Sequence, residues 1–203
     1  LASITVTLDT GDTVVLTTAT ESTTLTGTYT VDTGDNSADL TVSSYVLTSA
    51  PTDTAGKAMT STSVPTGANN IAGAQAIVID TTAPTLSSAT ANTAGTQVTL
   101  TFNESINSTT AVAGDFAVSV GATSITVSSI SVSGSTVILT LGTPAVIGDV
   151  ISVVYTAPTS NSATSNSAIQ DTGGNDAVGF TTTAVVPAAT TTTTTAPAPS
   201  GGG

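Results

Sequence analysis

The sequence alternates apolar and polar residues with a period of two along most of its length. Residues 4–8 read ITVTL and residues 98–102 read VTLTF. Successive side chains of a β-strand point to opposite faces, so this alternation gives each strand one apolar and one polar face. The frequent threonine and valine residues are β-branched and fit a pleated sheet better than a helix. No window of helical length has apolar residues at helical spacing. We therefore expect an all-β protein.

Turn signals separate the alternating runs. Glycine stands beside Asp, Asn or Ser at residues 10–12, 33–36, 133–135 and 147–149. Short alternating runs separated by such turns are typical of an antiparallel β-sandwich.

The order of features along the chain occurs twice. Each copy has a strand, a Gly-Asp turn, a strand that ends in tyrosine, an Asp-Thr-x-Gly loop and a last strand. The tyrosines are Tyr45 and Tyr155, and the loops begin at Asp53 and Asp171. We predict two tandem domains at residues 1–80 and 81–186. Residues 187–203 form a Thr/Pro/Gly-rich tail that cannot bury enough apolar surface to offset its ordering entropy.

The strands that we expect in the first domain are 4–8, 14–18, 24–31, 39–45 and 75–79. Those that we expect in the second domain are 85–91, 96–103, 115–119, 123–132, 135–141, 149–156 and 178–186.

Composition excludes several classes of function. The chain has no His and no Cys, which excludes Ser-His-Asp and Cys-His catalysis and the common zinc sites. Lys57 is the only Lys or Arg, against 13 Asp and Glu, so the formal net charge is −12 and no nucleic-acid surface is expected. With 3% aromatic residues, sugar hydrolysis by paired carboxylates is not expected either. The apolar runs are far shorter than the ~18 residues that a membrane span needs, so we expect no membrane insertion. We predict that the protein is not an enzyme.

Two sets of motifs along the chain match known repeats. The first set is residues 27–31, 34–40, 53–56 and 76–84, and the second is residues 80–84, 98–105, 131–141, 148–149, 154–158 and 169–176. On the first set, residues 1–84 resemble the bacterial immunoglobulin-like repeats of large secreted adhesins and surface proteins. On the second, residues 80–186 resemble the SwmB-type repeat of a cyanobacterial swimming-motility surface protein. The resemblance implies two tandem immunoglobulin-like antiparallel β-sandwiches, the first lacking its first two strands.

A sandwich without two strands would expose an apolar face and unpaired edges. Either the chain is a fragment, processed or divergent, or another chain supplies a strand by addition at the edge formed by residues 4–8. The expected partners are other copies of the chain or neighbouring surface-protein domains, and possible further partners are cell-surface glycans.

Strand direction predicts an acidic pole in the second domain. Strands that alternate in direction bring the entry linker and the loops after the second and sixth strands to the same end. This end would gather Asp80, Glu104, Asn107, Asp171, Asn175 and Asp176. Ca²⁺ takes 6–8 oxygen ligands, so these side chains form a candidate calcium site, and the resemblance implies that such an ion stiffens the domain linker.

The alternative is that Asp171 and Asn175 make side-chain-to-backbone turns beside the adjacent glycines, with no ion. In the first domain Lys57 stands where the second has Asn175, which disfavours calcium there. We interpret Asp9, Asp12, Asp32 and Asp35 as hairpin-turn residues. We expect both Tyr45 and Tyr155 to pack near a core with the hydroxyl bonded locally.

The function that we predict is a non-catalytic, extracellular structural or adhesion module of a bacterial cell-surface protein, such as an adhesin, surface layer, filament or sheath. Its role would be spacing and self-association. One alternative is a virion decoration or tail-fibre protein, and another is a carbohydrate-binding module, which would need an exposed aromatic platform.

Overall fold

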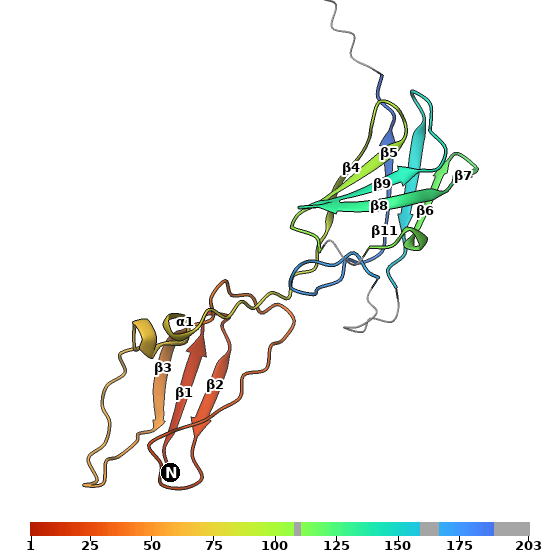
Figure 1. The fold of residues 1–203 in the computed structure, drawn as a ribbon. Coiled ribbons are helices and arrows are strands. Elements are labelled where there is room, and N and C mark those ends of the chain that lie inside the picture. The colour runs from red at the N-terminus through yellow and green to blue at the C-terminus, as the bar shows by residue number, and fades with distance from the viewer. Residues whose placement is uncertain (108–110, 159–166, 189–203) are drawn as a thin grey trace, which may run out of the picture. The chain divides into compact units, whose positions relative to one another are not determined.

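A computed structural model describes residues 1–107, 111–158 and 167–188 of the chain. The protein divides into two compact units, Leu1–Thr82 and Ala83–Gly203, and each is described by itself (Figure 1). The all-β prediction is confirmed, since eleven strands form three antiparallel sheets in the described part of the chain. Within the described residues, no helix is long and apolar enough to span a membrane. Most of the predicted tail, residues 189–203, lies outside the described part.

The first unit contains a three-stranded sheet with the order β2-β1-β3. Its strands are β1 (Ser3–Leu8), β2 (Thr13–Thr17) and β3 (Val42–Ser49). Two short helical turns follow, η1 (Gly67–Asn69) and α1 (Ile71–Ala74). Figure 1 shows the three strands side by side, with β1 in the middle.

One face of this sheet is apolar. The alternation predicted for residues 4–8 places Ile4, Val6 and Leu8 on this face, and the register sets Ile4 opposite Leu16 and Val6 opposite Val14. Only Leu8, Val14 and Leu40 are buried in this small core, and Ile71 and Ile79 are among the side chains that pack against them. The buried core therefore covers one end of the apolar face rather than all of it.

The hypothesis that residues 4–8 form an open edge is wrong. β1 pairs with β2 on one side and with β3 on the other, so it is the central strand of its sheet. The strand forms a hairpin with β2, and the later strand β3 returns to its second side. Within the described residues of this sheet, β2 and β3 are the edges.

The strand predicted at residues 24–31 is not formed. Only Thr26 pairs with the sheet, through two backbone hydrogen bonds with Thr17 at the end of β2. The chain comes so close to β2 at Gly27 that an added Cβ would lie 2.6 Å from the carbonyl oxygen of Val15. Beyond this contact, the Tyr29 hydroxyl donates to the Asp35 carboxylate at 2.7 Å. Tertiary contacts thus hold this segment outside the ladder.

The strand predicted at residues 75–79 also fails to join β3. Ile79 instead exchanges two hydrogen bonds with Ser37, and the Leu40 N–H donates to the Ile77 carbonyl at 2.7 Å. The first unit therefore has one sheet and an irregular layer of chain, where two sheets were expected.

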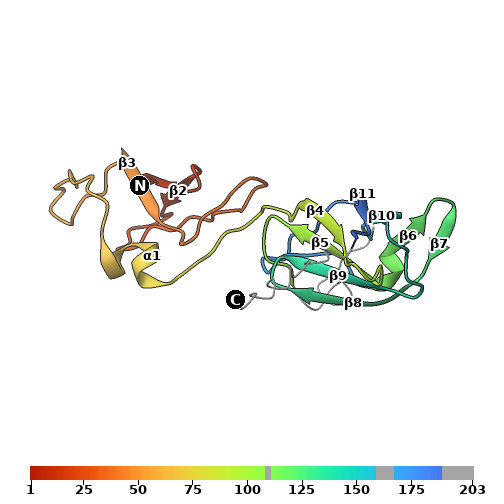
Figure 2. The same ribbon diagram turned by 90° about the horizontal axis from the view of Figure 1, so that it is seen from above.

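The second unit is a sandwich of two four-stranded antiparallel sheets, with the orders β4-β5-β9-β8 and β11-β10-β6-β7. Figure 2 shows the strands of the first sheet in front of those of the second. The strands are β4 (Leu86–Ala91), β5 (Gln97–Phe102), β6 (Phe116–Val120), β7 (Thr123–Ile125), β8 (Val127–Ser133), β9 (Thr136–Leu141), β10 (Val150–Tyr155) and β11 (Phe180–Val185), and η2 (Ala113–Asp115) precedes β6.

Alternating residues of both sheets fill the interior of the sandwich. Val98 and Leu100 of β5 are fully buried, and so are Val137 and Leu139 of β9 and Ile151 of β10. The four aromatic residues of this unit belong to the same core, where Tyr155 lies with its ring centroid 5.2 Å from those of both Phe116 and Phe180. They therefore supply packing rather than an exposed aromatic platform.

The strand predicted at residues 123–132 divides into two. β7 pairs with β6 in one sheet, whereas β8 pairs with β9 in the other. The change of sheet occurs at Thr126, whose carbonyl accepts the Gly142 N–H at 2.8 Å. An added Cβ at Gly142 would clash with the Thr126 hydroxyl oxygen, so a side chain at this position would force Thr126 to shift.

Candidate functional site

The loop between β10 and β11 is organised by Asp171, whose side chain is 1% exposed. One carboxylate oxygen accepts the backbone N–H groups of Gly174 at 2.6 Å and Asn175 at 2.8 Å. The other accepts the side-chain amide of Asn175 at 2.8 Å. Gly174 has a φ of +98°, a conformation that side chains disfavour. The side-chain-to-backbone turn weighed as the alternative to calcium is thus present in the loop.

The segment after β5 lies beside this loop. Ile106 forms a bridge with Asp171, and the Asn107 N–H donates to the Gln170 carbonyl at 2.7 Å. These contacts bring a carboxylate oxygen of Glu104 within 4.8 Å of one of Asp171. The expectation that the loops after the second and sixth strands meet at one end is correct for these two residues.

Asp176 lies at the closing end of the same loop. Its carboxylate accepts the Gln170 side-chain amide at 3.1 Å, and the same amide nitrogen donates to the Gly174 carbonyl at 2.8 Å. Gln170 therefore links the two arms of the loop, a role that sequence reasoning did not assign. The backbones of Gln170 and Asp176 also form an isolated antiparallel β-bridge across this turn.

Asp80 lies in the first unit, two residues before its end at Thr82. Its carboxylate accepts the Thr82 N–H at 3.0 Å. Nearby, Asn36 accepts the N–H of Thr81, and the Thr81 hydroxyl donates to the Asp35 carbonyl. The last residues of the first unit are therefore tied to the turn at residues 34–36.

The equivalent loop of the first unit begins at Asp53 and has the same internal hydrogen bonds. Its carboxylate accepts the N–H groups of Ala55 and Lys57, each at 2.9 Å, and Gly56 has a φ of +79°. In contrast to Asp171, Asp53 is exposed.

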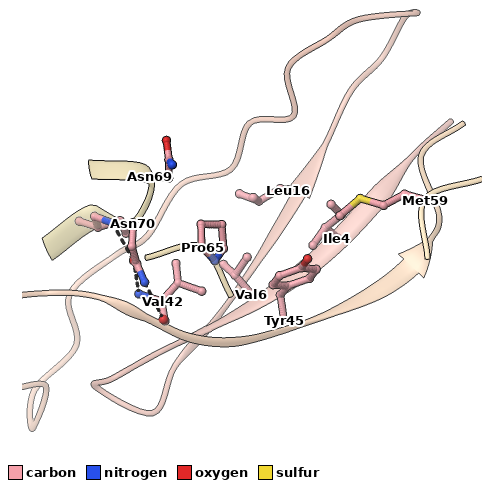
Figure 3. Close-up of a pocket in the computed structure, with 10 residues that line it drawn as sticks. Ile4, Val6, Leu16, Val42, Tyr45, Met59, Pro65, Asn69 and Asn70 are labelled. Atoms are coloured by element: carbon pink, nitrogen blue, oxygen red, sulfur yellow. Dashed lines mark hydrogen bonds between the residues drawn. The ribbon is translucent and has the colours of Figure 1, made fainter. Parts of the chain in front are cut away.

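Both repeat tyrosines are hydrogen-bonded through the hydroxyl, but to residues 14 and 16 positions away rather than locally, and of the two only Tyr155 belongs to a buried core. Tyr155 is 2% exposed, and its hydroxyl oxygen accepts the Ile169 N–H at 2.8 Å. Burial raises the pKa of this phenol. The Tyr45 hydroxyl donates to the Ser61 carbonyl at 3.0 Å, and its ring lines an apolar hollow in the first unit (Figure 3).

A second carboxylate cluster was missed by the sequence analysis, which treated its members as separate turn residues. Asp35 is 8% exposed, and its carboxylate accepts the Asp32 N–H and the Tyr29 hydroxyl, each at 2.7 Å. The Asp32 N–H and the Tyr29 hydroxyl lower the pKa of Asp35. Desolvation and the neighbouring Asp35 raise the pKa of Asp12.

Asp9 also acts at long range. Its carboxylate accepts the Ser37 hydroxyl at 2.6 Å and the Thr41 N–H at 2.9 Å. The side chain therefore joins the end of β1 to the segment before β3. Only the spacing of the acids was visible in the sequence, because their partners lie 28 and 32 residues away.

Solved structures similar to this chain come from a bacterial surface-layer protein. The S-layer protein rSbsC(31-844) has a TM-score of 0.44 and 23% sequence identity, over 53% of this chain and 14% of that chain. The N-terminal part of the S-layer protein SbsC has a TM-score of 0.42 and 22% identity, over 52% of this chain and 24% of that chain. The present chain thus spans less than a quarter of either protein. No curated protein matches the chain.

The family comparison concerns the second unit and the last residues of the first. The resemblance to immunoglobulin-like repeats predicted for residues 1–84 stays a prediction. Residues 79–160 match the family described as a putative flagellar system-associated repeat, in agreement with the resemblance to a SwmB-type repeat.

Proposed function

We propose that the chain is a non-catalytic structural module of a bacterial cell-surface assembly, in which it acts as a spacer and self-association unit. The observation that carries the proposal is the match of residues 79–160 to a flagellar system-associated repeat. The second unit gives it physical support, because its interior is packed with side chains such as Leu100, Leu139 and Tyr155. A rigid sandwich of this kind suits a part that holds other parts at a distance. Any association with neighbouring molecules would then depend on the side chains on the outer surface of the chain.

Surface labelling of the producing bacterium tests this proposal. An antibody raised against the second unit is expected to label intact cells, and brief protease treatment of those cells should remove the signal. A cytoplasmic protein labelled in parallel is the control, and it should react only after permeabilisation. Labelling of the chain that also requires permeabilisation would contradict a surface role.

Calcium binding near the acidic end of the second unit is a further part of the proposal. Glu104 and Asp171 supply carboxylate oxygens within 4.8 Å of each other. Asn107, Asn175 and Asp176 are on the same two segments, and the sequence-based ligand set adds Asp80 from the end of the first unit. All are hard oxygen donors of the type that Ca²⁺ prefers, so the donor chemistry fits the ion. Bound Ca²⁺ would offset the repulsion between the carboxylates.

Calcium titration of the full chain, measured by calorimetry and by thermal unfolding, tests this part. We expect added Ca²⁺ to raise Tm and EDTA to reverse the rise, because an ion that binds only the native state stabilises it. Glu104→Gln should abolish the rise. Glu21→Gln, which removes the same charge from an exposed site of the first unit, should leave it intact. An unchanged Tm in EDTA and in excess Ca²⁺ would reject the calcium part alone.

A further inference from the structure

The edge strand β3 has a side that no other strand covers within the described residues. β3 pairs with β1 only, over the length from Val42 to Ser49. At its first residue, the Asn70 side chain accepts the Val42 N–H at 3.0 Å and donates to the Val42 carbonyl at 3.1 Å. Asn70 thus takes the place of a neighbouring strand at this one position, and no strand pairs with the remainder of the edge within the described residues.

The direction of the backbone groups on this edge follows from the rest of the sheet. Thr17 exchanges hydrogen bonds with Thr26 on the outer side of β2, so its N–H and C=O point away from β1. The N–H and C=O groups of successive residues point alternately to the two sides of a strand. In the register of this sheet, those of Thr5 therefore point towards β3, and those of the β3 residue opposite Thr5 point back towards β1. Consequently the N–H and C=O groups of Tyr45 and Leu47 point to the free side.

An apolar hollow adjoins this edge. It has a volume of about 280 Å³ and lies over the apolar face of the sheet, where the small core does not reach. Figure 3 shows Ile4, Val6 and Leu16 lining it together with Val42 and Tyr45 of β3, and Met59 and Pro65 from the segment after β3 line it as well. A partner strand on β3 would therefore extend both the hydrogen-bonded ladder and the apolar surface.

The second unit shows what covers the equivalent edge. β10 is followed by an Asp-Thr-x-Gly loop as β3 is, and it pairs with β6 on one side and β11 on the other. β11 is antiparallel and has the uncharged sequence FTTTAV. The β11 counterpart in the first unit, residues 75–79, pairs with residues 37–40 instead. The occupant that fits β3 is therefore an uncharged antiparallel strand.

The sequence of β3 itself meets this description. It reads VSSYVLTS, with no charge, no Pro and no Gly, and so lacks the features by which edge strands normally avoid pairing. The formal charge of −12 makes two copies repel each other, so they can approach best along an uncharged strand. The other edge, β2, has Thr26 over its end and Asp12 beside its start.

Two copies of β3 are self-complementary in one register. In this register a two-fold axis passes between the Val46 residues of the two copies, so Tyr45 of one copy lies opposite Leu47 of the other. The N–H and C=O groups of Tyr45 and Leu47 that point outwards then form hydrogen bonds between the copies. The apolar side chains of both copies then lie on the same side of the joined sheet. Aromatic–aliphatic cross-strand pairs of this kind stabilise sheets.

We infer that β3 is the surface through which two copies of this chain associate, antiparallel about Val46, to make one continuous six-stranded sheet. The inference rests on the self-association part of the proposed function and names its partner, a second copy, and its place. Side-chain contacts across the axis would come from Val46 on the threonine-rich face and from Tyr45 and Leu47 on the apolar face.

A pair of matched charge substitutions in the full chain tests the inference. Val46 and Val15 both lie opposite Thr5, and they are 59% and 52% exposed. We expect Val46→Lys to weaken the dimer about tenfold or more in analytical ultracentrifugation, because two like charges would face each other. Val15→Lys, on the same face but on β2 at the opposite edge of the sheet, should leave dimerisation unchanged. An equimolar mixture of Val46→Lys and Val46→Asp should restore the dimer.

Cross-linking gives an independent reading, since the chain has no Cys. Residues opposite each other in a non-hydrogen-bonded pair have Cα atoms about 4.5 Å apart, within disulfide range. Val46→Cys should therefore form a disulfide dimer on mild oxidation, and Val15→Cys should not. A wild-type chain that stays monomeric at millimolar concentration, or a dimer lost equally in both lysine variants, would overturn the inference. Neither outcome would alter the surface labelling that tests the proposed function.

Discussion

The two Asp-Thr-x-Gly loops have the same local structure in different surroundings. The N–H of Asp53 donates to the Lys57 carbonyl at 3.0 Å, and the N–H of Asp171 donates to the Asn175 carbonyl at 3.1 Å. In each loop the Asp carboxylate accepts the N–H of the residue four positions later. Yet Asp171 is buried and Asp53 is exposed. Four residues are enough to make the turn, but they do not determine its burial.

The difference comes from what each loop packs against. In the second unit Ile169, at the start of the loop, is fully buried, and its N–H donates a hydrogen bond to the hydroxyl oxygen of Tyr155 at the end of β10. The first unit has a single sheet and a core of only three buried apolar residues, so its loop has no buried core to pack against. The same hydrogen bonds should therefore stabilise the second unit much more than the first.

The largest expected effect is that of removing the two loop carboxylates. Asp171→Ala should lower the free energy of unfolding of the second unit by about 3 kcal/mol, because the partly buried N–H groups of Gly174 and Asn175 would lose the buried carboxylate that accepts them. Asp53→Ala should cost only about 0.5 kcal/mol in the first unit, because water can replace the carboxylate. Urea unfolding of the full chain measures the loss, and hydrogen exchange assigns it to a unit. Equal losses in the two variants would contradict the role given to burial.

A smaller effect is expected for the two repeat tyrosines. Tyr155→Phe should cost about 1–2 kcal/mol, since the Ile169 N–H would stay buried without an acceptor. Tyr45→Phe removes hydrogen bonds to the exposed carbonyls of Ser61 and Ser63, so we expect a change below about 0.5 kcal/mol. Thermal unfolding of both variants against the wild type is the measurement. A larger loss for Tyr45→Phe would show that this hydroxyl anchors the segment over the hollow.

The smallest expected effect is a difference in pH dependence between the units. The Asp35 pKa is lowered in the folded protein, so its ionised form contributes stability that is complete above about pH 4 and is lost as the pH falls through the folded pKa. Desolvation raises the pKa of Asp115, so its ionisation costs stability as the pH rises through the folded pKa. Asp35→Asn should therefore lower Tm at pH 6, whereas Asp115→Asn should raise it.

Both Tm differences should shrink as the pH falls below about 4, because the charge of these carboxyl groups contributes less to the difference between the folded and unfolded states. Tm measured from pH 3 to pH 6 for the full chain and both variants gives the comparison. Parallel profiles, in which each variant differs from the wild type by the same amount at every pH, would show that the charges of Asp35 and Asp115 do not matter to folding.

Local sequence determined most of the strands of the second unit and the turns of both loops. The alternation placed strands near β4, β5, β6, β9, β10 and β11 within a few residues, and Asp171 with its glycines specified a turn. Such features depend on contacts between residues a few positions apart, and these are present in any context in which the chain is extended or turned. The meeting of Glu104 with Asp171 also followed, because strand direction in a sandwich is a simple consequence of strand order.

Only the tertiary structure decided which edges and faces meet. β1 is central because β3 returns to it, and the strand at residues 123–132 changes sheet where Gly142 comes close to Thr126. Each of these outcomes depends on residues far apart in the sequence, and alternation is the same whichever neighbour a strand takes. The period of two determines which side chains point inwards, whereas contacts between residues distant in the sequence determine which side chains they pack against.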